Sequence, residues 1–134
     1  AGIRKSFTKV FSFPAKVGVT IPANRVPSQT TQDNYVNNVL NAYDAAASSS
    51  ARLNVLMKEW YLASWGNGVE PYNFYRRTGK PDNLQYAINP NPEAFIRSFF
   101  YPAVYANLNN QATQKSTTNV RVFWDTNPDN LFKF

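Results

Sequence analysis

The stretch "SSSARLNVLMKEWYLAS", residues 48–64, decides the fold. Its apolar side chains recur at the i, i+3, i+4, i+7 spacing of one helix face, at Leu53, Leu56, Met57 and Trp60. Serine favours the start of a helix because its hydroxyl accepts a hydrogen bond from a backbone amide that has no partner within the helix. The serines at 48–50 therefore predict the end of one helix and the start of a second, amphipathic one.

A preceding helix is predicted over residues 30–47. Thr30 and Thr31 are its cap candidates, Asp33 is an acidic residue in its first turn, and apolar residues such as Tyr35 and Val36 lie on one side. Because a connection of only about three residues joins the two helices, they are expected to pack antiparallel as a helical hairpin. A hairpin followed by another helix suits a tetratricopeptide-like array.

The N-terminal segment predicts the end of an amphipathic helix from Gly2 to about Phe13, followed by a long connection. Apolar residues fall at helical spacing over the first part, with basic residues between them. Pro14, Pro22 and Pro27 then remove amide donors, so a continuous helix is not expected there. Residues 14–28 are predicted to form a proline-rich connection across the surface.

Glycine and proline organise the segment that follows the hairpin. The turn Gly66-Asn67-Gly68 tolerates the left-handed backbone that ends helices. A short helix is then predicted over residues 69–77, ending at Thr78-Gly79, with Pro81 preventing its continuation. Residues 1–81 are thus expected to be helical apart from the proline-rich connection.

The last third of the chain, residues 82–134, is expected to be irregular. It is dense in Asn, Pro, Ser and Thr, which compete with helix and sheet through local hydrogen bonds. Short extended pieces are predicted near residues 98–105 and 120–124 from their aromatic and β-branched content. The predicted fold class is mostly α, with a tetratricopeptide-like helical hairpin and a large, loop-rich C-terminal region.

The composition supports one folded domain and excludes several kinds of chemistry. The chain has 134 residues, 43% of them hydrophobic, which suits a single packed core. It contains no cysteine and no histidine, so thiolate nucleophiles, imidazole bases and His- or Cys-ligated zinc are excluded. No apolar stretch is long enough to span a membrane as a helix.

The net charge of +6 favours an anionic partner in general terms, but not nucleic acid in particular. The basic residues are spread along the chain and form no run typical of a nucleic-acid-binding arm. Thr78-Gly79-Lys80 invites comparison with a phosphate-binding loop. That motif needs a glycine where Phe74 stands and a hydroxyl where Pro81 stands, so no nucleotide site is predicted.

Paired carboxylates are the remaining route to catalysis. Glu59 and Glu70 lie among apolar and aromatic residues and could be partly buried as an acid and a base. Pairing with Arg76 or Arg77 is the commoner fate of such acids. No catalytic residue and no metal ligand is therefore assigned.

The aromatic residues could form a platform for sugar rings or peptide side chains, but a core role is favoured for Trp60 and Tyr75. Arg76 and Arg77 are adjacent on a helix, so only one of them can face the core. That arginine is expected to bind a carboxylate or several carbonyls and so tie the helix end to the irregular region.

Three motifs resemble one known family. "MKEWYLASWGNGVEPYNFYRRTGKP", residues 57–81, resembles the C-terminal signature of SusD/RagB-like nutrient-binding lipoproteins, in which a helix ends near Gly-x-Gly, a Glu-aromatic helix follows, and Arg-Arg-Thr-Gly-x-Pro closes it. "RSFFYP", residues 97–102, resembles the family's Arg-rich segment, and "VFWD", residues 122–125, its terminal Trp-Trp-Asp. The chain departs from the family pattern at Ser98, Tyr105 and Phe123.

The resemblance implies structural roles for the motif residues and carries over no ligand contact. These residues are Trp60, Gly66, Gly68, Glu70, Tyr75, Arg76, Arg77, Thr78, Gly79, Pro81, Arg97, Tyr101, Pro102, Asn109, Trp124 and Asp125.

The resemblance also implies a function. Family members are mostly helical, are not enzymes, use no cofactor, and lie on the extracellular face of the bacterial outer membrane. They act as lids on a SusC/RagA-like TonB-dependent β-barrel transporter and hold an oligosaccharide or a peptide for import. Residues 1–134 are then expected to be a single unit forming the C-terminal part of a larger SusD-like polypeptide, whose lipid anchor lies in an N-terminal part not in this chain.

Two other functions remain open from the sequence. A free-standing carbohydrate-binding or carbohydrate-active domain would bring two carboxylates or an exposed aromatic strip into one cleft. A basic adaptor for nucleic acid would bind with a steep dependence on salt.

Overall fold

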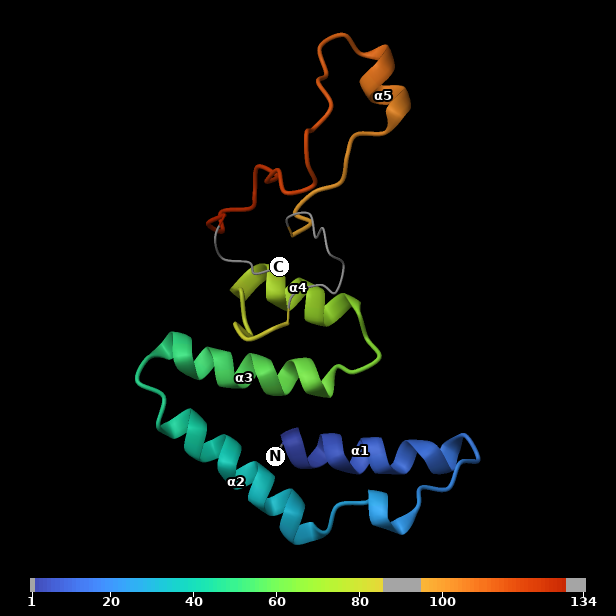
Figure 1. Ribbon diagram of the computed structural model, residues 1–134, viewed down its shortest axis with the longest axis vertical. Coiled ribbons are helices and arrows are strands. Elements are labelled where there is room, and N and C mark those ends of the chain that lie inside the picture. Colours follow the sequence, from blue (N-terminus) through green and yellow to red (C-terminus); the bar gives the residue numbers. More distant parts are fainter. Residues whose placement is uncertain (1, 86–94, 130–134) are drawn as a thin grey trace. The chain divides into compact units, whose positions relative to one another are not determined.

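The computed structural model describes residues 2–85 and 95–129, and its regular structure there is helical. Contacts between residues divide the molecule into two compact units, Ala1–Pro71 (unit 1) and Tyr72–Phe134 (unit 2). The length of the chain predicts a single core instead. Figure 1 shows the path of the chain through the helices α1 to α5. None of the described helices is long and apolar enough to cross a bilayer.

The first helix, α1, is longer than predicted. It spans Gly2–Lys16 and includes Pro14 in its last turn, so the connection begins at residue 17 rather than 14. Pro14 has no amide hydrogen to donate to the carbonyl four residues earlier, and the helix ends two residues after it, at Lys16. The helix ends where Gly18 takes a φ of 72° and Val19 N donates to Pro14 O at 2.9 Å, a left-handed C-terminal cap.

The second helix, α2, spans Gln29–Asp44, one turn shorter at its C-terminal end than predicted. Its cap is Ser28, not Thr30 or Thr31. The Ser28 hydroxyl accepts from Thr31 N at 3.2 Å, so the two threonines lie inside the first turn. The connection before it contains a short 3-10 helix, Ala23–Arg25.

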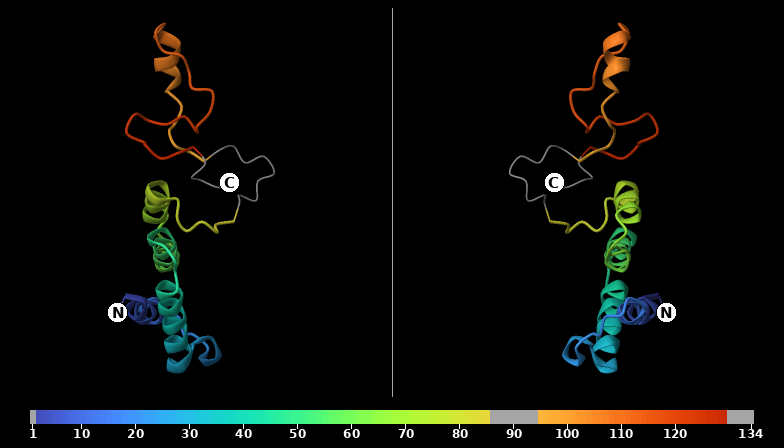
Figure 2. Two further views of the ribbon diagram at one scale, coloured as in Figure 1. Left: turned by 90° about the vertical axis from the view of Figure 1, so that its left-hand side faces the viewer. Right: turned by 90° about the vertical axis from the view of Figure 1, so that its right-hand side faces the viewer.

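The third helix, α3, confirms the prediction made from the serines. It spans Ser49–Ala63, and the Ser48 hydroxyl caps it by accepting from Ala51 N at 3.1 Å. In unit 1, α1 packs against both α2 and α3, and α2 packs against α3, which buries Val36 and Met57. Figure 2 shows α1 lying to one side of the α2 and α3 pair.

Helix α4 spans Val69–Thr78 and contains the boundary between the two units. Asn67 caps its N-terminus, because the Asn67 Oδ1 accepts from Val69 N at 3.1 Å. The predicted end is confirmed: Gly79 has a φ of 62°, and its amide donates to Tyr75 O at 2.7 Å.

The rest of unit 2 is irregular in its described part, with one short helix, α5, at Ala103–Leu108. The extended pieces predicted near 98–105 and 120–124 are wrong, since the described residues contain no strand and α5 overlaps the first piece. Aromatic and β-branched residues favour strands only where neighbouring strands are present to pack against. Here the amides of Arg97 and Ser98 instead share one acceptor, Thr118 O, at 2.9 and 3.0 Å.

Candidate functional site

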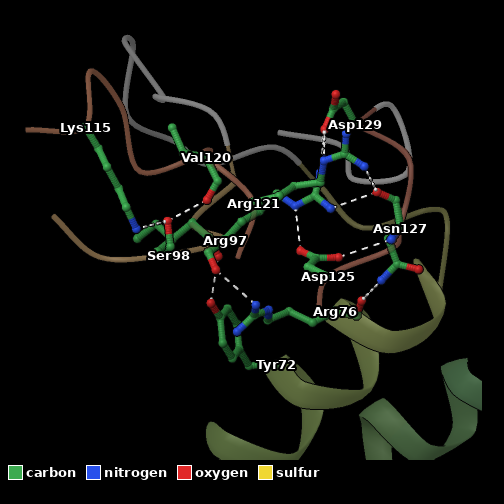
Figure 3. Close-up of polar contacts among 11 residues, drawn as sticks. Tyr72, Arg76, Arg97, Ser98, Lys115, Val120, Arg121, Asp125, Asn127 and Asp129 are labelled. Atoms are coloured by element: carbon green, nitrogen blue, oxygen red, sulfur yellow. Dashed lines mark hydrogen bonds and ion pairs between the residues drawn. The ribbon is translucent and has the colours of Figure 1, made fainter. Parts of the chain in front are cut away.

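Arg97 lies at the centre of the polar cluster of unit 2, and its side chain is fully buried. Its three guanidinium nitrogens have different acceptors (Figure 3). Nε donates to Asp125 Oδ2 at 2.8 Å, Nη1 to Asp129 Oδ1 at 2.7 Å, and Nη2 to Asn127 O at 2.8 Å. The planar guanidinium thus binds the segment from Asp125 to Asp129 along three directions at once.

Helix α4 joins this cluster through two side chains. Arg76 Nη2 donates to Arg97 O at 3.0 Å, and Tyr72 Oη donates to Ile96 O at 2.7 Å. Asn127 Nδ2 in turn donates to Arg76 O at 2.6 Å. One arginine of the pair therefore ties the helix to the irregular region, as predicted. That residue is Arg76, while Arg77 is exposed.

The ion pair at the centre shifts the pKa of both partners. The hydrogen bond from Arg97 holds the pKa of the Asp125 carboxyl below its usual range, although burial opposes this. The same hydrogen bond raises the pKa of Arg97 further above its already high value. Both groups are charged at neutral pH, and the charge of each offsets the free-energy cost of burying the other.

A second set of contacts extends the cluster toward α5. Lys115 Nζ donates to Ser98 Oγ at 2.9 Å and to Phe99 O at 3.2 Å, and lies 4.9 Å from the centre of the Tyr101 ring. Ser98 Oγ donates to Val120 O. Ser98, which departs from the family pattern, therefore has a structural partner of its own here.

The structure brings some motif residues together and leaves others apart. Arg76, Arg97 and Asp125 meet in the polar cluster, and Tyr75 is buried beside it with its ring 5.4 Å from that of Phe95. Gly79 and Pro81 are buried where α4 ends. Tyr101 meets the extension of the cluster through Lys115. The remaining motif residues lie outside the cluster: Trp60 on α3; Gly66 and Gly68 at the turn into α4; Glu70, Arg77 and Thr78 on α4; Pro102 and Asn109 around α5; and Trp124.

Thr78 and Lys80, which suggested a phosphate-binding loop, have partners within the fold. The Thr78 hydroxyl donates to Phe74 O at 2.7 Å and accepts from Lys80 N at 3.1 Å. Lys80 Nζ pairs with Asp82 Oδ2 at 2.7 Å.

Several aromatic side chains are exposed, including one of the two for which the sequence favours a core role. Trp60 is 46% exposed, so its predicted burial is wrong, whereas Tyr75 at 6% is buried as predicted. In unit 2, Phe99, Phe123 and Trp124 are 80%, 94% and 65% exposed. These three rings could stack on a ligand or pack against another protein.

The two carboxylates considered for catalysis have different surroundings. The sequence favours an arginine as the partner of Glu59. In the structure the partner is Tyr35, whose Oη donates to both carboxylate oxygens, at 3.0 and 2.8 Å. Glu70 is exposed in the first turn of α4. Across residues 2–85 and 95–129, no three acidic side chains gather in a way that could hold a metal ion.

We predict that Tyr35→Phe lowers the free energy of unfolding by about 1–2 kcal/mol, because it removes a hydrogen bond to a charged group. Burial, followed by the Glu59 contact, raises the pKa of Tyr35 to about 12. A phenol whose pKa is higher in the folded state stabilises the fold below its unfolded pKa of 10.0, and this contribution is lost as the pH rises from there toward 12.

Urea unfolding of the unaltered protein and of Tyr35→Phe between pH 7 and pH 11 measures the difference in their free energies of unfolding. It should be constant up to about pH 9 and shrink above that. Tyr61→Phe, on an exposed residue of α3, is the matched control and should change little. A constant difference across the whole range would contradict the assigned role of Tyr35.

None of the family models, curated proteins and solved structures compared with this chain matches it significantly. The functional interpretation therefore depends on the residues and contacts described above.

Some cluster residues were not singled out from the sequence. Asn127 and Asp129 follow Asp125 at alternate positions, and Lys115 stands alone among polar residues. The alternating Asp-Thr-Asn-Pro-Asp pattern could have suggested a segment that wraps a cation, but nothing in it specifies Arg97 as that cation. The pairing of Arg97 with Asp125 was not predicted.

Proposed function

We propose that this protein is a non-catalytic, nutrient-binding lid component of a TonB-dependent outer-membrane uptake complex of the SusD/RagB type. The observation that carries the proposal is the meeting of Arg76, Arg97 and Asp125 in one cluster. Each comes from a different one of the three motifs on which the resemblance rests. A shared structural role would explain why these residues recur in that order.

The helical architecture gives further support. The chain is mostly helical in its described part, and α2 and α3 are two consecutive, mutually packed helices that suit a tetratricopeptide-like hairpin. The described part of unit 2 is largely irregular, as the resemblance implies for this region. The proposed location is the extracellular face of the outer membrane, with the lipid anchor in the remainder of the polypeptide.

Exposed apolar side chains support a role in a larger assembly. Besides the rings of unit 2, Trp65 is 92% exposed and Leu108 is 83% exposed. These nearly fully exposed side chains are the proposed points of contact with the transporter or the rest of the polypeptide. The nutrient is proposed to be an oligosaccharide or a peptide.

The test combines retention with product analysis. The purified chain is passed over a SusC/RagA-like transporter in detergent, with a porin barrel as control, and is incubated separately with oligosaccharide and peptide panels that are followed by mass spectrometry. We expect specific retention on the transporter and no product. Turnover of any panel member, or equal retention on the porin, would overturn the proposal.

A free-standing carbohydrate-binding domain is the second candidate, favoured by the exposed rings of Phe99, Phe123 and Trp124. It requires the isolated chain to bind an oligosaccharide and to lose that binding on Trp124→Ala, with no affinity for the transporter. Sugar binding together with specific retention on the transporter would favour the lid function.

A further inference from the structure

The three helices of unit 1 enclose a groove of about 570 Å³. Helices α1, α2 and α3 all contribute to it, together with Pro27 from the connection. Its lining includes residues between Gly2 and Phe11 on α1, Tyr35 on α2, and Leu56, Glu59 and Leu62 on α3.

The groove is apolar, and its walls are incompletely covered. Val10, Leu56 and Leu62 line it and are 57%, 53% and 49% exposed, so each leaves half of its surface in water. On α1 the lining extends from Gly2 to Phe11, which is about 14 Å at the rise of an α-helix. An occupant of that length, lying between two helices, would cover all three side chains, whereas a compact small molecule would leave some of them exposed.

Glu59 is the one lining residue of this described groove that carries a charge at neutral pH. Its carboxylate accepts from the hydroxyl of Tyr35, which leaves it negative and with further lone pairs for a donor. Arg4 on α1 is already paired with Asp33. The groove itself therefore supplies a negative charge but no cation to balance it.

The aromatic side chains that line the groove also favour a cationic group on the ligand. Phe7 and Phe11 stack with their ring centres 6.2 Å apart, and Phe7 meets the Tyr35 ring edge-on at 5.8 Å. Aromatic faces attract ammonium and guanidinium groups, and a nearby carboxylate strengthens that attraction. A cation placed near Glu59 would find both.

We propose that this groove binds an amphipathic helix whose apolar face carries one lysine or arginine, with that side chain pairing with Glu59. Docking of an amphipathic helix into an apolar groove is a recurring mode of peptide recognition, and here the carboxylate supplies the charge complementarity. A lipid surface fits less well, because its hydrocarbon and anionic head groups would both oppose the Glu59 carboxylate. The proposal does not depend on the proposed transport function.

Two stapled helical peptides of about 16 residues provide the probe. They are identical, with a leucine-rich face, except that the central residue of that face is lysine in one and glutamate in the other. Binding to the full 134-residue chain is measured by calorimetry. We expect the lysine peptide to bind about tenfold more tightly, as for a partly desolvated ion pair.

Variants of the chain test whether the preference for the lysine peptide arises at Glu59. Glu59→Gln should bring the two affinities together, whereas Glu70→Gln, on an exposed residue of α4, should leave the tenfold ratio unchanged. Leu62→Glu adds a charge at a half-exposed lining position without touching the core and should weaken both peptides. Far-UV circular dichroism and thermal melting check that each variant is folded.

Three results would overturn the proposal. The first is equal affinity of the two peptides for the unaltered chain. The second is a ratio that survives in folded Glu59→Gln protein. The third is that neither peptide binds, while zwitterionic or anionic vesicles do bind and lose that binding in the Leu62→Glu variant. That result would assign the groove to a membrane surface.

Discussion

Arg97→Met is expected to lower the free energy of unfolding of unit 2 by about 3–5 kcal/mol, because removing one partner of a buried ion pair leaves the other uncompensated. The Arg97 side chain is fully buried, and Asp125 is only 6% exposed. The substitution also removes the shorter donors of Asn127 O and Asp129, which keep only their 3.4 Å contacts with Arg121. Native-state hydrogen exchange at the amides of Arg97 and Ser98, which share Thr118 O, measures the loss within unit 2.

Two comparisons separate charge from packing. Arg77→Met, on an exposed residue of α4, should change stability by less than about 0.5 kcal/mol. Arg97→Met combined with Asp125→Leu should recover part of the loss, since a buried pair replaced by apolar groups leaves no unpaired charge. A single Arg97→Met substitution as mild as Arg77→Met would show that the cluster is dispensable.

Asp125→Asn is expected to destabilise unit 2 by about 2–3 kcal/mol at pH 7 and to make its stability less sensitive to acid. The Arg97 hydrogen bond lowers the pKa of Asp125 in the folded state from an ordinary value of 3.8. A carboxyl with a lowered folded pKa stabilises the fold above its unfolded pKa, and that contribution is lost as the pH falls through the folded pKa. The pKa of Arg97 is raised and lies far above this range, so it adds no acid dependence.

Urea unfolding from pH 7 down to about pH 2 gives the measurement. The difference between the unaltered protein and Asp125→Asn should be largest above about pH 4 and should shrink below it. Asp129→Asn is the control, since that side chain is 67% exposed and should show a smaller effect. A difference that grows as the pH falls would contradict the assigned pairing.

Local features of the fold were predictable from the sequence. Ser48 begins α3, Gly79 ends α4, and the main helices lie near their expected positions. The boundaries that differed also have local causes. Ser28 rather than a threonine caps α2, and α1 continues through Pro14 into its last turn. Neighbouring residues compete for these roles, and periodicity alone does not rank them.

The candidate sites were less predictable. The sequence suggested that either Arg76 or Arg77 would tie α4 to the irregular region, and the structure selects Arg76. The sequence assigned Arg97 and Asp125 only as separate motif residues. Burial was misjudged for Trp60, because helical spacing shows which side chains share a face but not whether another element covers that face.

The sequence by itself determined the helices of this protein and most of their ends, because a helix is held by hydrogen bonds between residues four apart and by caps one turn away. Only the tertiary structure decided that Arg97 meets Asp125, 28 residues along the chain, and that Tyr35 meets Glu59, 24 residues along. Such contacts depend on the path of the turns and irregular segments between the partners. That path is set by packing of the whole unit rather than by the preferences of any one segment.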